Sequence, residues 1–296
     1  MPSTSDAAMD KTTMATYLPE VWSRTATVTY RSNVVIVPLL DHTWEPEAGV
    51  GMGDTIFIPG FSANQRTDVD PRSTFGTAAE PTWKATTEDQ TTLNINKMPI
   101  DAHAIPVEMS LQTMAGYEAK LIQGIGQAIA LYVDYDLASD GAHGFDVFTD
   151  IGADNVDITD DVILEGETVL NSSNAPLDGR FFIISPASRA SLMQIEVLRN
   201  QLYNASVGNL DGSKGAGYLG KIYTLDVYMS NNLKTATSGK YNFIGQRECI
   251  AFAAQQEVKV VQELSLKDGI IKHIVGYMVY GRTLVKSSFG RAVLGK

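Results

Sequence analysis

The chain has 296 residues, 44% of them hydrophobic, and a formal charge of −11 at pH 7. Its length permits one large or two ordinary domains. Its acidity argues against a nucleic-acid binder, because such a protein needs a cluster of lysine and arginine that this sequence lacks. No run approaches the ~18 apolar residues of a membrane span.

The N-terminal residues 1–17 are small and polar, and we expect them to form a mobile arm. They lack the basic start and the apolar centre of a signal peptide. The only cysteine, Cys249, cannot form an intrachain disulfide. Both features fit folding in a reducing cytoplasm.

An amphipathic helix is predicted to open at Leu18-Pro19, because proline is tolerated in the first turn of a helix. Its predicted apolar members are Trp22, Val28 and Tyr30. The β-branched run 34–37 that follows is compatible with a strand or with a helix end.

Residues 54–106 contain two predicted strands around a long polar stretch. The first, Thr55–Ile58, is expected to stop at Pro59, and the second covers Thr91–Ile95. Because a two-stranded ribbon is only marginally stable in water, this excursion needs a partner. We predict that it lacks a core of its own and packs on another subunit, with a flexible surface loop as the alternative.

The longest segment with helical spacing runs from Ile105-Pro106 to about Leu137, with Ser110 as a candidate N-cap. At ~1.5 Å per residue the helix would be about 40 Å long. That length suits a strut along an elongated subunit, and a buried core helix is the alternative. The apolar stripe predicted for it consists of Leu111, Met114, Leu121, Ile122, Ile125, Ile129, Tyr132 and Val133.

Aspartates recur between Phe145 and Asp161. Their spacing does not match the calcium loop of an EF-hand. We therefore expect a solvated turn and a helix start, since acidic residues favour helix N-termini.

From Val162 the pattern is that of a compact α/β region. The predicted elements are a helix marked by Val162, Leu164, Val169 and Leu170, a turn at 174–180, a buried strand from Phe181 that ends at Pro186, a helix capped by Ser188 and running through Leu202, a strand at Tyr223–Met229, and strand or short-helix pieces at Tyr241–Ile244 and Cys249–Ala254.

A long hairpin is predicted near the end of the sequence. Val258, Val260 and Leu264 lie on one side of a period-two pattern, and 266–269 is a strong turn signal. Ile270–Tyr280 continues as a second apolar strand. We expect this hairpin to lie beside the long helix.

Candidate chemical motifs are weak. The segment Gly215–Gly220 spells G-x-G-x-x-G, but a dinucleotide site needs a strand before the glycines and a helix after them, and the predicted order here is the reverse. We therefore interpret this glycine-rich segment as a flexible loop tip rather than a dinucleotide site. The histidines have no metal-ligand spacing, and Cys249 is expected to be a buried small hydrophobe. We therefore expect no cofactor, no metal and no enzymatic activity.

Four stretches carry a resemblance to a known family, namely Leu18–Ser23, Gly53–Pro59, Ala175–Pro186 and Gly220–Asn231. Together with the order of elements, they resemble the major capsid proteins of tailed bacteriophages, which have the Hong Kong 97-type fold. The resemblance covers nearly the whole chain. It implies an α+β fold with an N-terminal arm, an extended β loop, a peripheral domain with a long spine helix, and an axial α/β domain.

The resemblance also implies a division of the chain. The implied parts are 1–35 as N-terminal arm and short helix, 36–53 with 107–150 as peripheral domain, 54–106 as extended β loop, 151–255 as axial domain, 256–281 as peripheral-domain hairpin, and 282–296 as a segment returning to the axial domain.

The function implied is that of a structural shell protein. It would self-assemble into pentamers and hexamers of an icosahedral capsid enclosing double-stranded DNA, located in the virion and assembled in the host bacterial cytoplasm. Scaffolding, portal and decoration proteins would be separate partners, and no membrane is involved. The glycine-rich residues 204–220 are expected at the capsomer axis, where copies of one loop crowd together. Candidate subunit-interface residues are Trp22, Arg66, Arg72, Lys84, Asp211, Lys214, Lys267 and Asp268.

Two alternatives remain open at the level of the sequence. An encapsulin-like nanocompartment shell shares the fold but encloses an enzyme. A nucleotide-binding α/β enzyme would instead use the glycine-rich loop.

Overall fold

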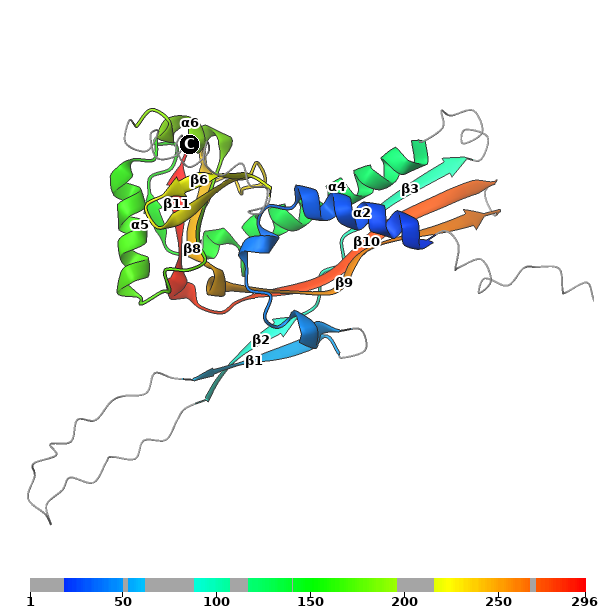
Figure 1. Ribbon diagram of the computed structural model, residues 1–296, viewed down its shortest axis with the longest axis horizontal. Coiled ribbons are helices and arrows are strands. Elements are labelled where there is room, and N and C mark those ends of the chain that lie inside the picture. Colours follow the sequence, from blue (N-terminus) through cyan, green and yellow to red (C-terminus); the bar gives the residue numbers. More distant parts are fainter. Residues whose placement is uncertain are drawn as a thin grey trace, which may run out of the picture.

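A computed structural model of the chain describes residues 19–49, 53–61, 88–106, 117–139, 141–195, 216–266 and 270–296. The molecule is elongated, with a six-stranded sheet at one end, a long arm of helices and strands at the other, and a two-stranded ribbon that projects away from both (Figure 1). Helices and strands are mixed along the chain, so the predicted α+β class is confirmed. The arm predicted for residues 1–17 lies outside the described residues.

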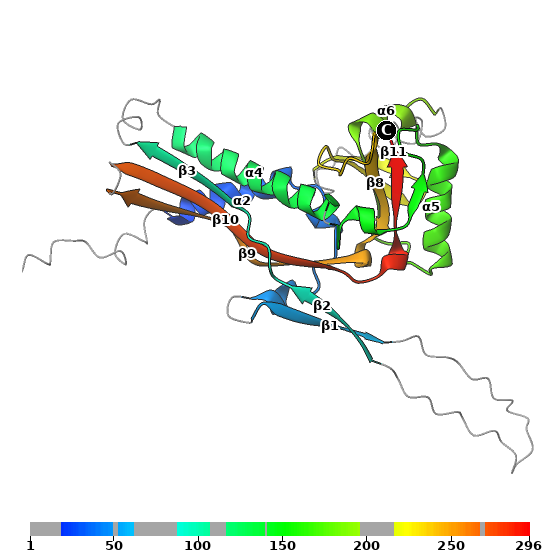
Figure 2. The same cartoon turned by 180° about the vertical axis from the view of Figure 1, so that it is seen from behind.

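The long arm is built on the helix α4 (Tyr117–Ser139), which lies along a three-stranded antiparallel sheet (Figure 2). The strand order of this sheet is β3 (Ile100–Pro106), β10 (Ile271–Leu284), β9 (Ile250–Ser265). β9 and β10 form the hairpin that was predicted beside the long helix, and that prediction is confirmed.

Most of the described part of the predicted stripe on α4 is buried, namely Ile122, Ile125, Ile129 and Val133. Tyr132 is 49% exposed, so its predicted burial is wrong. The reason is a second helix, α2 (Pro19–Asn33), which packs on the side of α4 that carries Gly126 and Ala130. The buried arc is thereby turned away from Tyr132. Leu111, Met114 and the candidate cap Ser110 lie outside the described residues.

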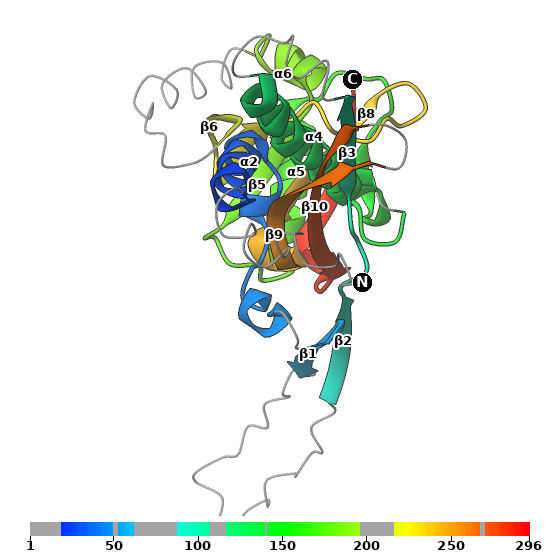
Figure 3. The same ribbon diagram turned by 90° about the vertical axis from the view of Figure 1, so that its right-hand side faces the viewer.

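α2 lies against α4 and the edge of β9 (Figure 3). A Cβ atom on Gly126 would lie 2.6 Å from the carbonyl oxygen of Ala26, so the close approach of the two helices requires glycine there. Toward the sheet, the Ser23 hydroxyl accepts a hydrogen bond from the Val260 N–H at 3.0 Å, and the Thr27 hydroxyl donates to the Val258 carbonyl at 3.1 Å. α2 thus covers part of an edge strand that would otherwise be open to pairing.

The apolar members predicted for α2 do not share one face. Tyr30 is buried, whereas Val28 is 61% exposed, which contradicts the prediction. Two residues span about 200° of a helix, so these side chains point to opposite sides. The run 34–37 is a helix end, because it leads into the short 3-10 helix η1 (Val37–Leu39), which is followed by η2 (Glu45–Ala48).

The projecting ribbon consists of β1 (Thr55–Phe61) and β2 (Glu88–Asn94), which pair antiparallel. Both predicted strands are therefore present. β1 continues through Pro59, so its predicted end at that residue is wrong. Proline is tolerated in edge strands, and a two-stranded ribbon consists only of edges.

The base of the ribbon has a small core within its own chain. Ile56, Ile58 and Leu93 pack with Ala251 and Ala253 of β9. β3, which also belongs to the 54–106 excursion, pairs with β10. The expectation that the excursion lacks a core of its own is therefore wrong for its described strands. Residues 62–87, between β1 and β2, lie outside the described part of the chain.

The sheet at the other end of the molecule has six strands. Their order is β4 (Asp150–Gly152), β11 (Gly290–Gly295), β8 (Lys240–Gln246), β5 (Arg180–Ile184), β7 (Leu225–Met229), β6 (Tyr218–Ile222). β4 pairs with β11 and β5 with β7 in parallel, and the other pairs are antiparallel. β5 is buried throughout, as predicted. The strand predicted at Tyr223–Met229 corresponds to β7, and Tyr223 itself lies in the turn between β6 and β7.

Two helices accompany this sheet. α5 (Asp160–Ser172) starts in the acidic segment, as predicted, but it buries Ile163 and exposes Leu164. α6 (Pro186–Leu192) is capped by Ser185 and not by Ser188, because the Ser185 hydroxyl accepts the Ser188 N–H at 3.0 Å with Pro186 in the first turn. α6 gives way to a turn after Leu192, so the continuous helix predicted through Leu202 is wrong at 193–195, and residues 196–202 lie outside the described part of the chain.

One apolar core joins the arm to the six-stranded sheet. Phe145, in the short helix η3 (Phe145–Val147), stacks on Phe243 of β8 with 4.2 Å between ring centroids. Both belong to the same cluster as Ile125 of α4 and Val258 of β9. A second cluster lies on the α5 side of the sheet. The two ends are therefore connected by continuous packing.

Two aspartates fasten α4 to its neighbours. Asp136 accepts a hydrogen bond from the Tyr280 hydroxyl at 2.5 Å and pairs with the buried Arg282 of β10. The buried carboxylate of Asp134 accepts the backbone N–H groups of Val35 and Ile36 at 2.9 and 3.0 Å. Burial raises the pKa of Asp134 to about 7, although these hydrogen bonds act in the opposite direction.

The contact of α2 with α4 gives a first prediction. Gly126→Val should lower the free energy of unfolding of the free subunit by about 2 kcal/mol, because a branched side chain forces the two helices apart. The matched control is Gly124→Ala, where an added Cβ meets nothing within 4 Å. That change should raise stability by ~0.5–1 kcal/mol. Chemical denaturation measures both, and equal effects of the two substitutions would contradict the close packing.

A second prediction concerns the pH dependence of stability. Because the pKa of Asp134 is raised in the folded state, the stability due to its protonated form is present below about pH 4 and is lost as the pH rises toward 7. Asp134→Asn cannot ionise. The free energy of unfolding of this variant minus that of the wild type should therefore grow, by on the order of 4 kcal/mol, between pH 4 and pH 7.5. A difference that stays flat across this range would show that Asp134 titrates normally.

Candidate subunit-contact site

The acidic segment is occupied by internal contacts. Within the described residues, no group of three or more His, Cys, Asp or Glu side chains is arranged to hold a metal ion. The aspartates instead hold neighbouring elements: Asp146 pairs with Lys234 at 2.5 Å, Asp154 accepts the N–H of Gly239, Asp157 accepts the hydroxyl of Ser191, and Asp160 accepts the hydroxyl of Tyr223.

The described end of the G-x-G-x-x-G segment leads into a strand. Gly217 lies in a turn with φ of +76°, and Gly220 is already part of β6. A dinucleotide fingerprint requires a helix at this point. The geometry therefore favours a loop with a structural role over a dinucleotide site at these glycines, as the sequence analysis did. Residues 208–215 lie outside the described part of the chain.

Cys249 is a core residue. It is fully buried, and burial raises the pKa of its thiol to about 12. The thiolate that reactive cysteines use is thus strongly disfavoured, and the prediction of a buried small hydrophobe is confirmed. Among the described helices, none has both the length and the apolar content needed to cross a membrane.

The outer face of α4 is the first surface suited to contact with another subunit. Leu131, Tyr132 and Tyr135 are exposed there, and the small residues Gly124 and Ala128 lie on the same face. No charged residue occurs between Leu121 and Val133. An exposed helix face without charges is unusual on a soluble monomer and is typical of a protein-protein contact.

The far end of the hairpin is a second such surface. Leu264, Leu266 and Ile270 are exposed, Leu266 to 73%. Of the residues predicted on one side of the period-two pattern, Val258 and Val260 are buried, whereas Leu264 is exposed. Ser23 of α2 contacts β9 at Val260, and Leu264 lies further along that strand.

The ribbon side of the molecule carries the third surface suited to contact with another subunit. Phe57 of β1, Met98 after β2 and Ile100 of β3 are all more than half exposed. Phe57 belongs to the ribbon, whereas Ile100 begins the strand β3 of the arm sheet. The exposed apolar residues are thus spread over α4, the hairpin and the ribbon side of one subunit.

The predicted interface residues remain untested, because the described part of the chain does not include their side chains. Trp22 lies in the first part of α2, but its side chain is outside the described residues. The other candidates also lie outside them, namely Arg66, Arg72, Lys84, Asp211, Lys214, Lys267 and Asp268. Neither the exposed face of α4 nor the apolar residues beside the hairpin turn were predicted, although Lys267 and Asp268 of the predicted turn were named as interface candidates. The absence of charges between Leu121 and Val133 is the sequence signal that could have indicated the first of them.

No protein-family model matches the chain, and no curated protein sequence matches it. Solved structures do match. The chain is similar to a protein of Mycobacterium phage Che8, with 18% identity, a TM-score of 0.66, and coverage of 88% of this chain and 90% of that chain. It is also similar to the capsid structure of the cyanophage P-SCSP1u, with 13% identity, a TM-score of 0.63, and coverage of 90% and 89%.

A third match is the capsid of a native GTA particle, with 12% identity, a TM-score of 0.59, and coverage of 92% of this chain and 91% of that chain. Each likeness spans about nine tenths of both chains. The chain therefore has the α+β fold of tailed-phage major capsid proteins, the Hong Kong 97-type fold.

Proposed function

We propose that this chain is a major capsid protein, a structural subunit without catalytic activity that self-assembles into an icosahedral shell. The observation that carries the proposal is the fold likeness to phage and particle capsids over about nine tenths of each chain. The exposed apolar surfaces on α4, the hairpin and the ribbon support it, because a shell subunit must contact several neighbours at once. Many weak contacts per subunit suffice when they act together.

We propose that the subunit is divided into the same parts that the resemblance to capsid proteins implies. Residues 36–53 and 107–150, with the hairpin 256–281, form the peripheral domain, and 151–255 with the returning segment 282–296 form the axial domain. Residues 1–35 are the N-terminal arm and short helix, and 54–106 are the extended β loop. Pentamers and hexamers would form around the axial domain, with 204–220 at the axis.

The proposed setting is the capsid of a tailed-phage virion, assembled in the cytoplasm of the bacterial host. The enclosed molecule is double-stranded DNA, held by proximity rather than by sequence recognition, which suits an acidic chain. Scaffolding, portal and decoration proteins are proposed as separate partners. The eight interface residues predicted from the sequence remain predictions of where neighbours touch.

Electron microscopy of the protein expressed in bacteria tests the function. We expect closed particles of uniform size, and particles recovered from infected cells should contain double-stranded DNA. Particles that contain a packaged enzyme would favour a nanocompartment shell instead. A protein that stays monomeric at high concentration and binds a dinucleotide saturably would contradict the proposal.

The outer face of α4 gives a sharper prediction. Leu131→Glu places a charge on this apolar surface and should abolish particle formation, because a buried unpaired carboxylate in an interface costs several kcal/mol. Leu131 is exposed in the subunit, so the thermal unfolding of the free Leu131→Glu subunit should barely differ from that of the wild type. Leu131→Met keeps an apolar side chain of similar size and should assemble normally. Normal particle yield from Leu131→Glu would mean that this face is not a subunit contact.

A further inference from the structure

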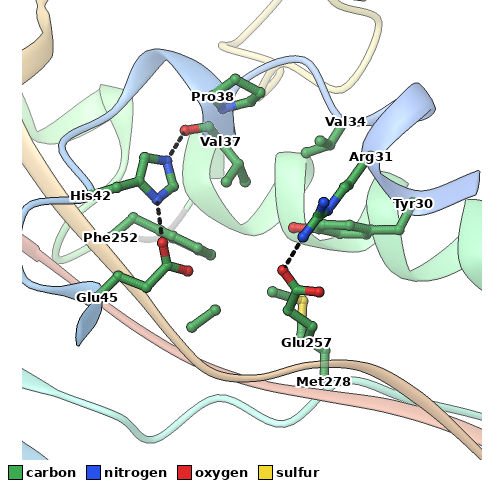
Figure 4. A pocket seen from close by; sticks show the side chains of 11 residues that line it. Tyr30, Arg31, Val34, Val37, Pro38, His42, Glu45, Phe252, Glu257 and Met278 are labelled. Carbon is green, nitrogen blue, oxygen red and sulfur yellow. Dashed lines mark hydrogen bonds and ion pairs between the residues drawn. The ribbon is translucent and has the colours of Figure 1, made fainter. Parts of the chain in front are cut away.

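A pocket of about 340 Å³ lies in the long arm. Its walls come from the C-terminal end of α2, from the segment between η1 and η2, and from β9 and β10 (Figure 4). Its floor is apolar: Val34, Val37, Phe252 and Met278 all line it and are almost fully buried. Such a floor fits the hydrocarbon part of an occupant.

The pocket also contains a polar group that lacks a partner. Tyr30 is only 8% exposed, and within the described part of the chain its hydroxyl has no hydrogen-bond partner. Figure 4 shows this oxygen turned toward the space between the pocket walls. A buried hydroxyl without a partner is unfavourable. The group is therefore suited to a hydrogen bond with something that enters the pocket.

Two ion pairs stand on opposite sides of the opening. Arg31 pairs with Glu257 on one side. On the other, His42 Nδ1 lies 3.4 Å from Glu45 Oε2, and His42 Nε2 lies 2.8 Å from the Val37 carbonyl oxygen. Both nitrogens of His42 already face oxygen atoms. Among the residues that line the pocket, the two carboxylates of Glu45 and Glu257 outnumber the one guanidinium of Arg31, and the Tyr30 hydroxyl is still without a partner.

The electrostatic balance around the pocket is negative. Burial raises the pKa of the Tyr30 phenol, and the carboxylates of Asp134, Glu257 and Glu45 raise it further. Arg31 is the cation that opposes them. An apolar floor beneath an excess of carboxylates is the environment that a lysine or arginine side chain prefers, because the stem can be buried while the charged end meets the acids.

We propose that this pocket receives a lysine or arginine side chain from a second copy of the chain. The inference rests on the proposed assembly into a shell and names one of its contacts. Charge complementarity favours this occupant: acidic copies with a charge of −11 repel one another, and the insertion of a basic side chain between Glu45 and Glu257 offsets that repulsion locally. In this contact the basic group donates a hydrogen bond to the Tyr30 oxygen.

The first test is Tyr30→Phe, measured on the free subunit and on particles assembled from the chain expressed alone. Removing the unpartnered hydroxyl should raise the Tm of the free subunit. In particles the same change removes a hydrogen bond to a charged group, so the concentration of free subunit in equilibrium with particles should rise about tenfold. Opposite signs are the signature of an occupant that binds this oxygen. Equal behaviour of variant and wild type in particles would overturn the inference.

The second test removes the charges of the opening. Glu45→Gln combined with Glu257→Gln should also raise the concentration of free subunit in equilibrium with particles. That concentration should depend less on salt than in the wild type, because salt screens the two charges that the variant lacks. Glu47→Gln is the matched control, since Glu47 is exposed on the same short helix η2 but does not line the pocket. The control should behave as wild type. If double variant and control behave alike, no cation enters the pocket.

These results separate the inference from the function on which it rests. Wild-type particles with unaffected pocket variants would leave the shell function standing and would overturn the pocket contact. Failure of the wild-type chain to assemble would overturn both. Because the particles contain only this chain, a basic side chain supplied by another protein would leave both variants without effect and would also contradict the proposal.

Discussion

The structure depends on the enclosure of one face of α4 between the β9–β10 hairpin and α2. Two close approaches make that packing possible. Gly126 lets the backbone of α2 approach at Ala26, and at Gly276 of β10 an added Cβ would lie 2.2 Å from the side chain of Ile125. Close-packed interiors do not tolerate extra atoms at such points. The two glycines therefore fix how the helices and the sheet of the long arm fit together.

The same enclosure explains why the remaining surfaces are free for other contacts. With one face buried, α4 still presents an uncharged outer face, and the hairpin extends past α2 to expose its apolar end. The arm is joined to the six-stranded sheet through Phe145 and Phe243, so the surfaces of α4 and the hairpin are connected to that sheet by continuous apolar packing. Several weak contact surfaces on one subunit suit the proposed assembly into a closed shell.

Much of this fold was predictable because it follows periodicity. The long helix, the hairpin, β5 and the two strands of the ribbon were predicted from alternation or helical spacing. The errors arose where tertiary packing decides. Tyr132 and Val28 have helical spacing but face solvent, since the position of α2 is not encoded in local pattern, and Ser185 caps α6 one turn before the predicted Ser188. The pocket was not predicted because its walls come from segments more than 200 residues apart in the sequence, such as Tyr30 and Glu257.

Hydrogen-deuterium exchange, compared between free subunits and assembled particles, tests most directly whether the enclosed face of α4 is the foundation of the structure. The amides of α4 from Ile122 to Leu137 and those of β10 from Ile274 to Tyr280 should exchange slowly and together in both states, because they open only when the whole subunit unfolds. Exchange of these amides as fast as that of β1 and β2 in the free subunit, while the six-stranded sheet stays protected, would contradict the account.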